Sequence, residues 1–177
     1  MELQAAPMKA DRILQASLTA MLCLFIVALY TTLGDKIAKV GAAAPAFSIR
    51  ADNGKVITAR DFGGKLLILN FWATWCAPCV YEIPSLNELQ RQLGPSGLVV
   101  LGISQDQSET DYKRFLDRFH VSFLTARQPD ESIKIRYGTI QLPESYIIDR
   151  NGKVIEKVVS EADWTSAPMV QYLRSLL

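Results

Sequence analysis

Histidine and cysteine are scarce in this 177-residue chain, which contains one histidine, His120, and three cysteines. A structural zinc site needs about four ligands, and these few residues supply no second half-site beside Cys76 and Cys79. Covalent haem attachment requires a histidine directly after a Cys-x-x-Cys pair, but Val80 occupies that position. We therefore expect neither a metal site nor a bound cofactor.

Basic residues are not in excess either, because 19 Lys and Arg stand against 18 Asp and Glu, a formal net charge of +1. A protein that binds nucleic acid needs a basic face that neutralises phosphates. No basic run is present, so we expect no nucleic-acid partner. The chain also lacks internal repeats and low-complexity tracts. With 49% hydrophobic residues, its length suits one domain and an appendage.

Charged residues are absent from Ile13 to Leu33, and a stretch of about 20 apolar residues can cross a bilayer as a helix. We predict a cytoplasmic tail at residues 1–12, a transmembrane anchor over this stretch and a linker at 34–44. A cleaved signal peptide is the alternative. Signal h-regions run to only about 7–15 residues, and the small-residue cleavage site at Ala42 to Ala44 lies far beyond the stretch. The anchor is therefore favoured.

Beyond Ala44 the sequence alternates between strand-like and helix-like segments, which is typical of an α/β fold. Apolar runs and turn signals predict strands at 47–49, 56–58, 66–71, 98–103, 121–124, 146–148 and 154–159. Apolar residues at helical spacing predict helices over 78–93, 111–119, 131–137 and 164–177. The last two strands flank Asn151-Gly152, a strong signal for a two-residue hairpin turn.

The segment from Trp75 to Cys79, with the sequence Trp-Cys-Ala-Pro-Cys, places two thiols at the start of a predicted helix. The unpaired N–H groups and the positive dipole of a helix N-terminus favour a thiolate, the form that attacks disulfides. We expect Cys76 to be the exposed nucleophile and Cys79, one turn deeper, to resolve the mixed disulfide. A purely structural bridge is disfavoured, because so short a loop removes little entropy from the unfolded chain.

With this dithiol after a strand, a proline before a later strand and a late hairpin, the chain from about Gly41 resembles the thioredoxin fold. It is most similar to the TlpA/ResA/CcmG group of membrane-anchored, thioredoxin-like proteins. The residues that carry the resemblance are Phe47, Gly64-Lys65, Asn70 to Cys79 and Pro143 to Asp149. The resemblance implies a central mixed sheet flanked by helices over residues 45–177, attached to an N-terminal transmembrane helix.

The resemblance also implies where substrate binds. Leu142-Pro143 is expected to form a cis peptide bond that faces the dithiol, and with Trp75 to contact the substrate. Glu144 departs from the threonine that often follows this proline in ResA-like proteins. Because alternate residues of an extended segment face opposite ways, we interpret Glu144 as turned to water; an inward orientation would raise the thiol pKa values.

A third catalytic residue, Glu82, is implied by the same family. Ordinary thioredoxins carry a buried Asp six residues before the first Cys, where this chain has Asn70, and an amide cannot exchange protons at working pH. ResA-like proteins place a Glu three residues after the second Cys. On a helix, that spacing puts Glu82 on the same face as Cys79. The alternative is a solvated acid that complements the helix dipole.

The resemblance thus implies a thiol:disulfide oxidoreductase, a protein-disulfide reductase. Basic residues flank the anchor equally, so the positive-inside rule is tied, but disulfides persist in oxidising compartments. We therefore expect a single-pass protein of the cytoplasmic membrane with its catalytic domain facing the periplasm or extracytoplasmic space. Implied partners are protein disulfides, such as those of apocytochrome c during cytochrome c maturation, and a membrane-embedded thiol reductant. The alternatives are a thiol oxidant, a peroxide-handling redoxin and a Cu(I)-delivery protein.

Overall fold

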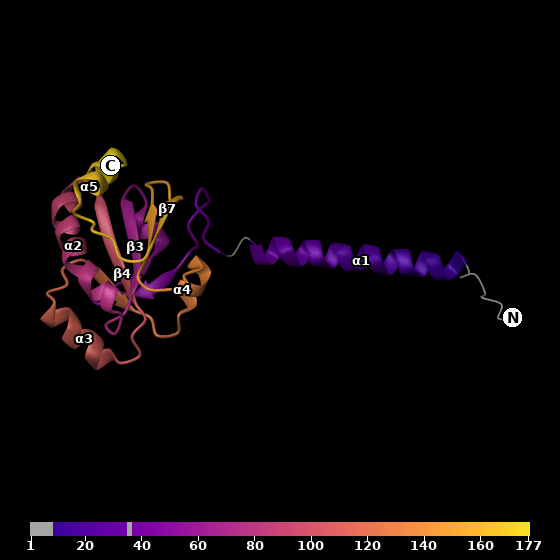
Figure 1. Cartoon of the computed structure of the whole chain (residues 1–177), viewed down its shortest axis with the longest axis horizontal. Coiled ribbons are helices and arrows are strands. Elements are labelled where there is room, and N and C mark those ends of the chain that lie inside the picture. The colour runs from indigo at the N-terminus through magenta and orange to yellow at the C-terminus, as the bar shows by residue number, and fades with distance from the viewer. Residues whose placement is uncertain (1–8, 35–36) are drawn as a thin grey trace. The chain divides into compact units, whose positions relative to one another are not determined.

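The structure is a computed structural model that describes residues 9–34 and 37–177 (Figure 1). By its internal contacts the chain divides into two units, Met1–Lys36 and Ile37–Leu177. The helix of the first unit, α1, runs over Lys9–Gly34. The predicted anchor lies within α1, whereas the first eight residues of the predicted tail lie outside the described residues.

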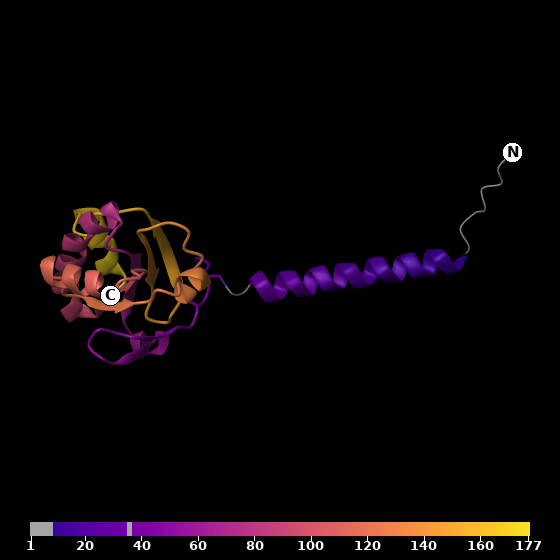
Figure 2. The same ribbon diagram turned by 90° about the horizontal axis from the view of Figure 1, so that it is seen from below.

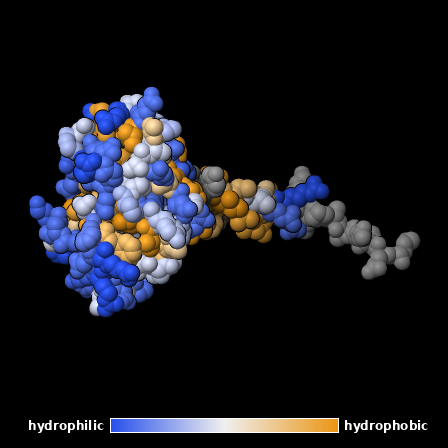
Figure 3. Space-filling model, turned by 60° about the vertical axis from the view of Figure 1, so that its left-hand side comes forward, coloured by the Kyte–Doolittle hydropathy of each residue, from blue (hydrophilic) through white to orange (hydrophobic). Residues whose placement is uncertain are grey.

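Helix α1 is apolar along most of its length, and hydrophobic residues cover much of it in Figure 3. Its segment Asp11–Leu29 has a mean hydropathy of 2.0, and none of it is buried. A helix of this length and composition can cross a membrane. A secretory signal near an N-terminus has the same properties, so the helix is consistent with either an anchor or a signal.

The second unit is built on a five-stranded mixed sheet of order β5-β4-β3-β6-β7. Strands β3, β4 and β5 are parallel, while β6 and β7 run antiparallel beside β3. A separate antiparallel hairpin is formed by β1 (Ser48–Arg50) and β2 (Val56–Thr58). The strands of the main sheet are β3 (Leu66–Trp72), β4 (Leu98–Ser104), β5 (Leu124–Arg127), β6 (Glu144–Ile148) and β7 (Val154–Val159).

Helices cover both faces of this sheet, and Figure 2 shows the layers on either side. The longer helices are α2 (Ala77–Leu93), α3 (Glu109–Arg118), α4 (Ser132–Tyr137) and α5 (Ala167–Ser175), and the short 3-10 turns are η1 (Ala59–Phe62) and η2 (Gly94–Ser96). Helices α2, α3 and α5 pack on the face that carries Ile68 and Trp72. The hairpin and α4 pack on the face that carries Leu69 and Phe71. This is the predicted thioredoxin-like fold.

Side chains of β3 alternate between the two faces of the sheet and contribute to the hydrophobic cluster on each face. All seven of its residues are buried, as expected of a central strand covered on both faces. Because successive side chains of a strand point to opposite faces, a continuous apolar run serves both hydrophobic clusters at once. Strand β3 is the central strand of the sheet, and it ends at Trp72, shortly before the Cys-x-x-Cys segment.

Two predicted elements were misplaced. The strand predicted at 121–124 is wrong, because the backbone of Val121 donates to Leu116 at the end of α3 and Ser122 donates to the Asn87 side chain. The strand is β5, which starts at Leu124. The last helix was predicted from Trp164 but begins at Ala167, because the Asp163 side chain accepts the Thr165 N–H and holds a turn there.

Candidate active site

The two cysteines of the Cys-x-x-Cys segment lie at the N-terminus of α2 and form a disulfide. Cys76 is the N-cap residue, and its Sγ accepts the backbone N–H of Cys79 at 3.3 Å. Pro78 occupies the first turn, where its missing N–H leaves no helical hydrogen bond unmade. The helix N-terminus thus contributes its N–H groups directly to the leading sulfur, which favours the Cys76 thiolate in the reduced state.

The expected exposure of Cys76 is wrong for this disulfide state. Cys76 is 6% exposed and Cys79 is 1% exposed. The N-cap hydrogen bond turns the Cys76 side chain toward the helix, and both sulfurs join the core cluster beneath α2. The exposed residues of the segment are Ala77 and Trp75, and Trp75 is 70% exposed.

The loop that precedes Cys76 is fixed by a buried carboxylate that sequence reasoning missed. Asp106, 3% exposed, accepts the Thr74 backbone N–H at 3.1 Å and the Thr74 hydroxyl at 2.6 Å. It also accepts the Ser104 hydroxyl at 2.6 Å. Asp106 thereby joins the end of β4 to the residue two positions before the nucleophile. The available signal was an acid placed two residues after the end of β4.

Glu82 is buried on α2, with 3% of its surface exposed. Its Oε1 accepts the indole N–H of Trp164, and its Oε2 accepts the Asn70 side-chain amide at 3.4 Å. Burial raises the pKa of Glu82 from 4.5 to about 7, while the hydrogen bonds from Trp164 and Asn70 act in the opposite direction. The alternative of a solvated first-turn acid does not hold. Cys79 is another buried residue of α2, so the acid and the second thiol both lie on the inner side of this helix.

A small opening connects this acid to solvent. Glu82 lines a pocket of about 200 Å³ between α2 and the loop that follows β7. Tyr81, Glu161 and Asp163 also line it. Glu82, whose pKa burial raises to about 7, therefore lines an open pocket through which a proton can leave.

The Leu142-Pro143 peptide bond is cis, as the resemblance implied. In the antiparallel pairing of β3 with β6, Phe71 lies opposite Glu144, so the next step of the register places Pro143 opposite Trp72. This is the end of β3 from which the chain enters the dithiol segment. Leu142 packs against the core cluster that contains both cysteines.

Glu144 is not turned to water, so that interpretation is wrong. Its side chain is 2% exposed, because both faces of β6 are covered. Its Oε1 lies 2.8 Å from the Lys157 ammonium and accepts the Tyr146 hydroxyl at 2.6 Å. Alternation along β6 places Glu144 with Tyr146, on the sheet face opposite α2. The acid therefore does not face the dithiol either.

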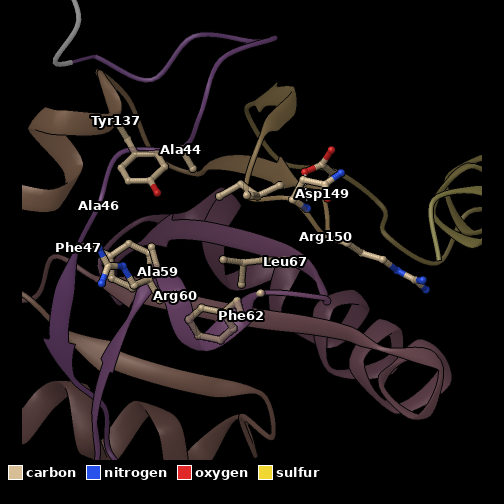
Figure 4. Close-up of a pocket in the computed structure, with 14 residues that line it drawn as sticks. Ala44, Ala46, Phe47, Ala59, Arg60, Phe62, Leu67, Tyr137, Asp149 and Arg150 are labelled. Carbon is tan, nitrogen blue, oxygen red and sulfur yellow. Dashed lines mark hydrogen bonds between the residues drawn. The ribbon is translucent and has the colours of Figure 1, made fainter.

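A cavity of about 410 Å³ lies apart from these residues, between η1 and the turn that joins β6 to β7 (Figure 4). Phe62 and Leu67 contribute to its apolar wall, and Arg60 and Arg150 lie at different sides of it. None of the cysteines and neither Glu82 nor Trp164 lines it. In the described parts of the chain, no cluster of three or more His, Cys, Asp or Glu side chains is placed to hold a metal ion.

Comparison with known proteins identifies the chain. A family model described as "AhpC/TSA family" matches residues 40–157. The chain belongs to this family. The Thiol-disulfide oxidoreductase ResA of Bacillus thuringiensis subsp. konkukian is 35% identical over 147 residues, which cover 83% of each chain. That of Bacillus anthracis is 33% identical over 138 residues, covering 78% of this chain and 79% of the relative.

Solved structures of thiol:disulfide interchange proteins are also similar to this chain. A candidate thiol:disulfide interchange protein DsbE from Chlorobium tepidum superposes with a TM-score of 0.73 at 29% identity, covering 78% of this chain and 98% of that one. A thioredoxin-family thiol:disulfide interchange protein from Chlorobium tepidum TLS gives 0.64 at 27% identity, covering 74% and 94%. This member of the AhpC/TSA family is thus ResA-like, a thiol-disulfide oxidoreductase with a thioredoxin-like fold, a Cys-x-x-Cys disulfide and an N-terminal apolar helix.

Proposed function

We propose that this protein reduces disulfides in exported proteins, with Cys76 as nucleophile, Cys79 as resolving thiol and Glu82 as the proton acceptor for Cys79. The observation that carries the proposal is the pairing of a helix-N-terminal disulfide with a buried acid on the same helix. A thiol pair alone would suit a thiol oxidant equally well. An acid with a pKa near 7, three residues along α2 from the buried thiol, suits a two-step exchange at neutral pH.

The exchange proceeds in two balanced steps. In the reduced protein, the Cys76 thiolate attacks one sulfur of the substrate disulfide, whose S–S bond breaks, and the other substrate sulfur leaves as a thiolate. Cys79 then transfers its proton to Glu82 and attacks Cys76 Sγ. The mixed disulfide breaks and the Cys76–Cys79 bond forms. The second substrate sulfur also leaves as a thiolate, and the substrate, carrying two more electrons, becomes a dithiol when its two sulfurs take up one proton from Glu82 and one from water.

Substrate binding is assigned to Trp75, Leu142 and Pro143. Trp75 precedes the nucleophile and is largely exposed, and aromatic side chains of this kind are enriched in protein interfaces. The start of β6 lies at the same end of the sheet as the dithiol. An extended substrate segment can therefore place its disulfide at Cys76 while it contacts the Leu142-Pro143 bond.

The cellular setting follows from the same chemistry. We assign residues 13–33 to a membrane anchor, residues 34–44 to a linker and residues 45–177 to an extracytoplasmic catalytic domain. Apocytochrome c, whose paired cysteines must be reduced before haem is attached, is the proposed substrate. Each cycle leaves Cys76 and Cys79 oxidised, so a membrane-embedded thiol reductant is the proposed electron donor.

Replacing Cys79 with Ala tests this function. The variant lacks the resolving thiol, so the mixed disulfide at Cys76 should accumulate in growing cells, and apocytochromes c or other exported proteins with paired cysteines should be trapped. The Cys76→Ala control should trap none of them. The wild-type protein should be mostly reduced at rest.

Two results would contradict the proposal. A fully oxidised resting state with newly secreted reduced chains as the trapped species would make the protein a disulfide donor. Absence of any mixed disulfide together with tight Cu(I) binding would make it a copper-delivery protein.

A further inference from the structure

Trp164 is a completely buried tryptophan outside the helices and strands, in the loop between β7 and α5. Its indole N–H donates to Oε1 of Glu82, 82 residues earlier in the sequence. Its backbone N–H donates to the Ser85 hydroxyl at 3.4 Å, one helical turn beyond Glu82. The Ser85 hydroxyl also contacts the Ala162 carbonyl at 3.4 Å. The loop is thus held against α2 at Glu82 and one helical turn beyond it.

Few other groups can stabilise a charge on Glu82. From β3, the Asn70 side-chain amide donates to Glu82 at 3.4 Å and also donates to the Ser145 hydroxyl of β6 at the shorter distance of 2.9 Å. From the loop after β7, the Ala162 backbone gives a further hydrogen bond that favours ionisation, more weakly than the donors of Trp164 and Asn70. Glu161 and Asp163 of the same loop line the pocket at Glu82, and the charge of Glu161 opposes ionisation. Within residues 37–177, no Lys or Arg forms an ion pair with Glu82.

The indole N–H is therefore the main donor that offsets the burial of this carboxylate. A buried carboxylate that loses a hydrogen-bond donor becomes harder to ionise, because burial disfavours the charged form and the hydrogen bond favours it. A donor held in a rigid ring also fixes which way the carboxylate points. Both effects act on a group that we propose to receive the proton of Cys79.

We propose that Trp164 is a positioning residue for the thiol chemistry: its indole N–H orients the Glu82 carboxylate and stabilises its charged form, and so sets the pH range in which Glu82 accepts the Cys79 proton. This rests on the proposed role of Glu82. The loop after β7, far from the dithiol in sequence, is then part of the catalytic apparatus.

The test uses Trp164→Phe in the full-length protein in detergent micelles. Phenylalanine keeps an aromatic ring and removes the donor. The measured quantity is the pH dependence of the resolving step, in which Cys79 displaces a model mixed disulfide from Cys76. Loss of a hydrogen bond to a charged group should move the midpoint upward by about one to two pH units.

Trp72→Phe is the matched control. Trp72 is also buried, at 1% exposure, but its indole N–H has no hydrogen-bond partner among the described residues. This change removes the same atoms and leaves Glu82 untouched, so the midpoint should stay at the wild-type value. An unchanged midpoint in Trp164→Phe would show that Trp164 only packs the core. An equal shift in both variants would likewise overturn the proposal.

A second measurement needs no substitution of Trp164. In protein labelled with 5-fluorotryptophan, the ¹⁹F signal of Trp164 should titrate near pH 7 and lose that titration in Glu82→Gln. A Trp164 signal that is independent of pH while the resolving step still titrates would refute the proposal. If Glu82→Gln itself leaves the pH profile of the resolving step unchanged, the proposed role of Glu82 fails instead, which distinguishes the two failures.

Discussion

At the residue scale, Glu82 shows how one position can serve both folding and chemistry. A carboxylate on the inner face of α2 is costly to bury, and the structure offsets the cost with hydrogen bonds from the Trp164 and Asn70 side chains and from the Ala162 backbone, and with no ion pair within residues 37–177. Burial is the larger effect and raises the pKa of Glu82 to about 7. A side chain that is half protonated near neutrality can accept and return a proton with little free-energy cost.

The raised pKa of Glu82 predicts a pH dependence of stability. Between pH 4.5 and about 7, the unfolded chain has released this proton while the folded protein keeps it, so the free energy of unfolding falls as pH rises. The total fall is about 3 kcal/mol at most, at about 1.4 kcal/mol per pKa unit. Glu82→Gln should abolish this fall. Urea unfolding of the full-length protein across this pH range measures it.

The control for this prediction is Glu88→Gln, on the same helix. Glu88 is held by Arg91 and Gln92 at the surface, and these hydrogen bonds lower its pKa to about 2. Its removal should leave the fall between pH 4.5 and 7 in place. A wild-type protein whose stability is flat over this range would mean that Glu82 does not titrate there.

At the element scale, the sequence predicts most strands and helices but not the contacts between them. The apolar run of β3, the helical spacing of α2 and the Asn-Gly turn are local signals, and each produced a correct element. The donors to Glu82 could not be found this way, since Asn70 lies 12 residues away and Trp164 lies 82 away. Trp164 was even placed in a helix, because the turn made by Asp163 depends on polar contacts that periodicity does not register.

Glu144 was misjudged for a related reason. Alternation predicts that neighbouring residues of a strand face opposite ways, but it does not say whether either face meets water. Strand β6 lies between β3 and β7 and is covered on both faces. Its acid is therefore buried, where it contacts the buried Tyr146 and the half-buried Lys157. Only the sheet order, a property of the whole fold, determines this outcome.

The ion pair between the half-buried Lys157 of β7 and the buried Glu144 of β6 gives a test of stability. Lys157→Met should leave the Glu144 carboxylate buried without a cation and destabilise the protein by about 1–3 kcal/mol, because an unpaired buried group retains its full desolvation cost. Adding Glu144→Gln should recover much of that loss, since no charge then remains. Urea denaturation at pH 7 of both single variants and the double variant measures the coupling. Strictly additive effects would mean that the two side chains do not stabilise one another.

At the scale of the whole molecule, the chain combines two units, a redox domain from Ile37 to Leu177 and an N-terminal unit that contains the apolar helix α1. The domain contains both hydrophobic clusters and the complete candidate site. The helix exposes its apolar side chains along Asp11–Leu29, which water alone would not tolerate over so large a surface. A membrane anchor or a secretory signal suits such a helix, and an oxidising compartment is where the proposed reductase has substrates.

This organisation predicts a topology that reporter fusions can measure. Alkaline phosphatase fused after Gly41 should be active, because it needs the oxidising side of the membrane, and a fluorescent protein that folds only in the cytoplasm should be dark at the same junction. The full-length protein should remain in the membrane fraction after washing with high salt, with its N-terminal segment intact by mass spectrometry.

Replacing Leu22 and Phe25 with Lys within α1 should release the protein from the membrane or prevent its insertion, because each charge at the centre of a spanning helix costs about 3 kcal/mol. A soluble mature product that begins near Pro45 would instead show that the segment is a cleaved signal, and the redox domain would then act free of the membrane.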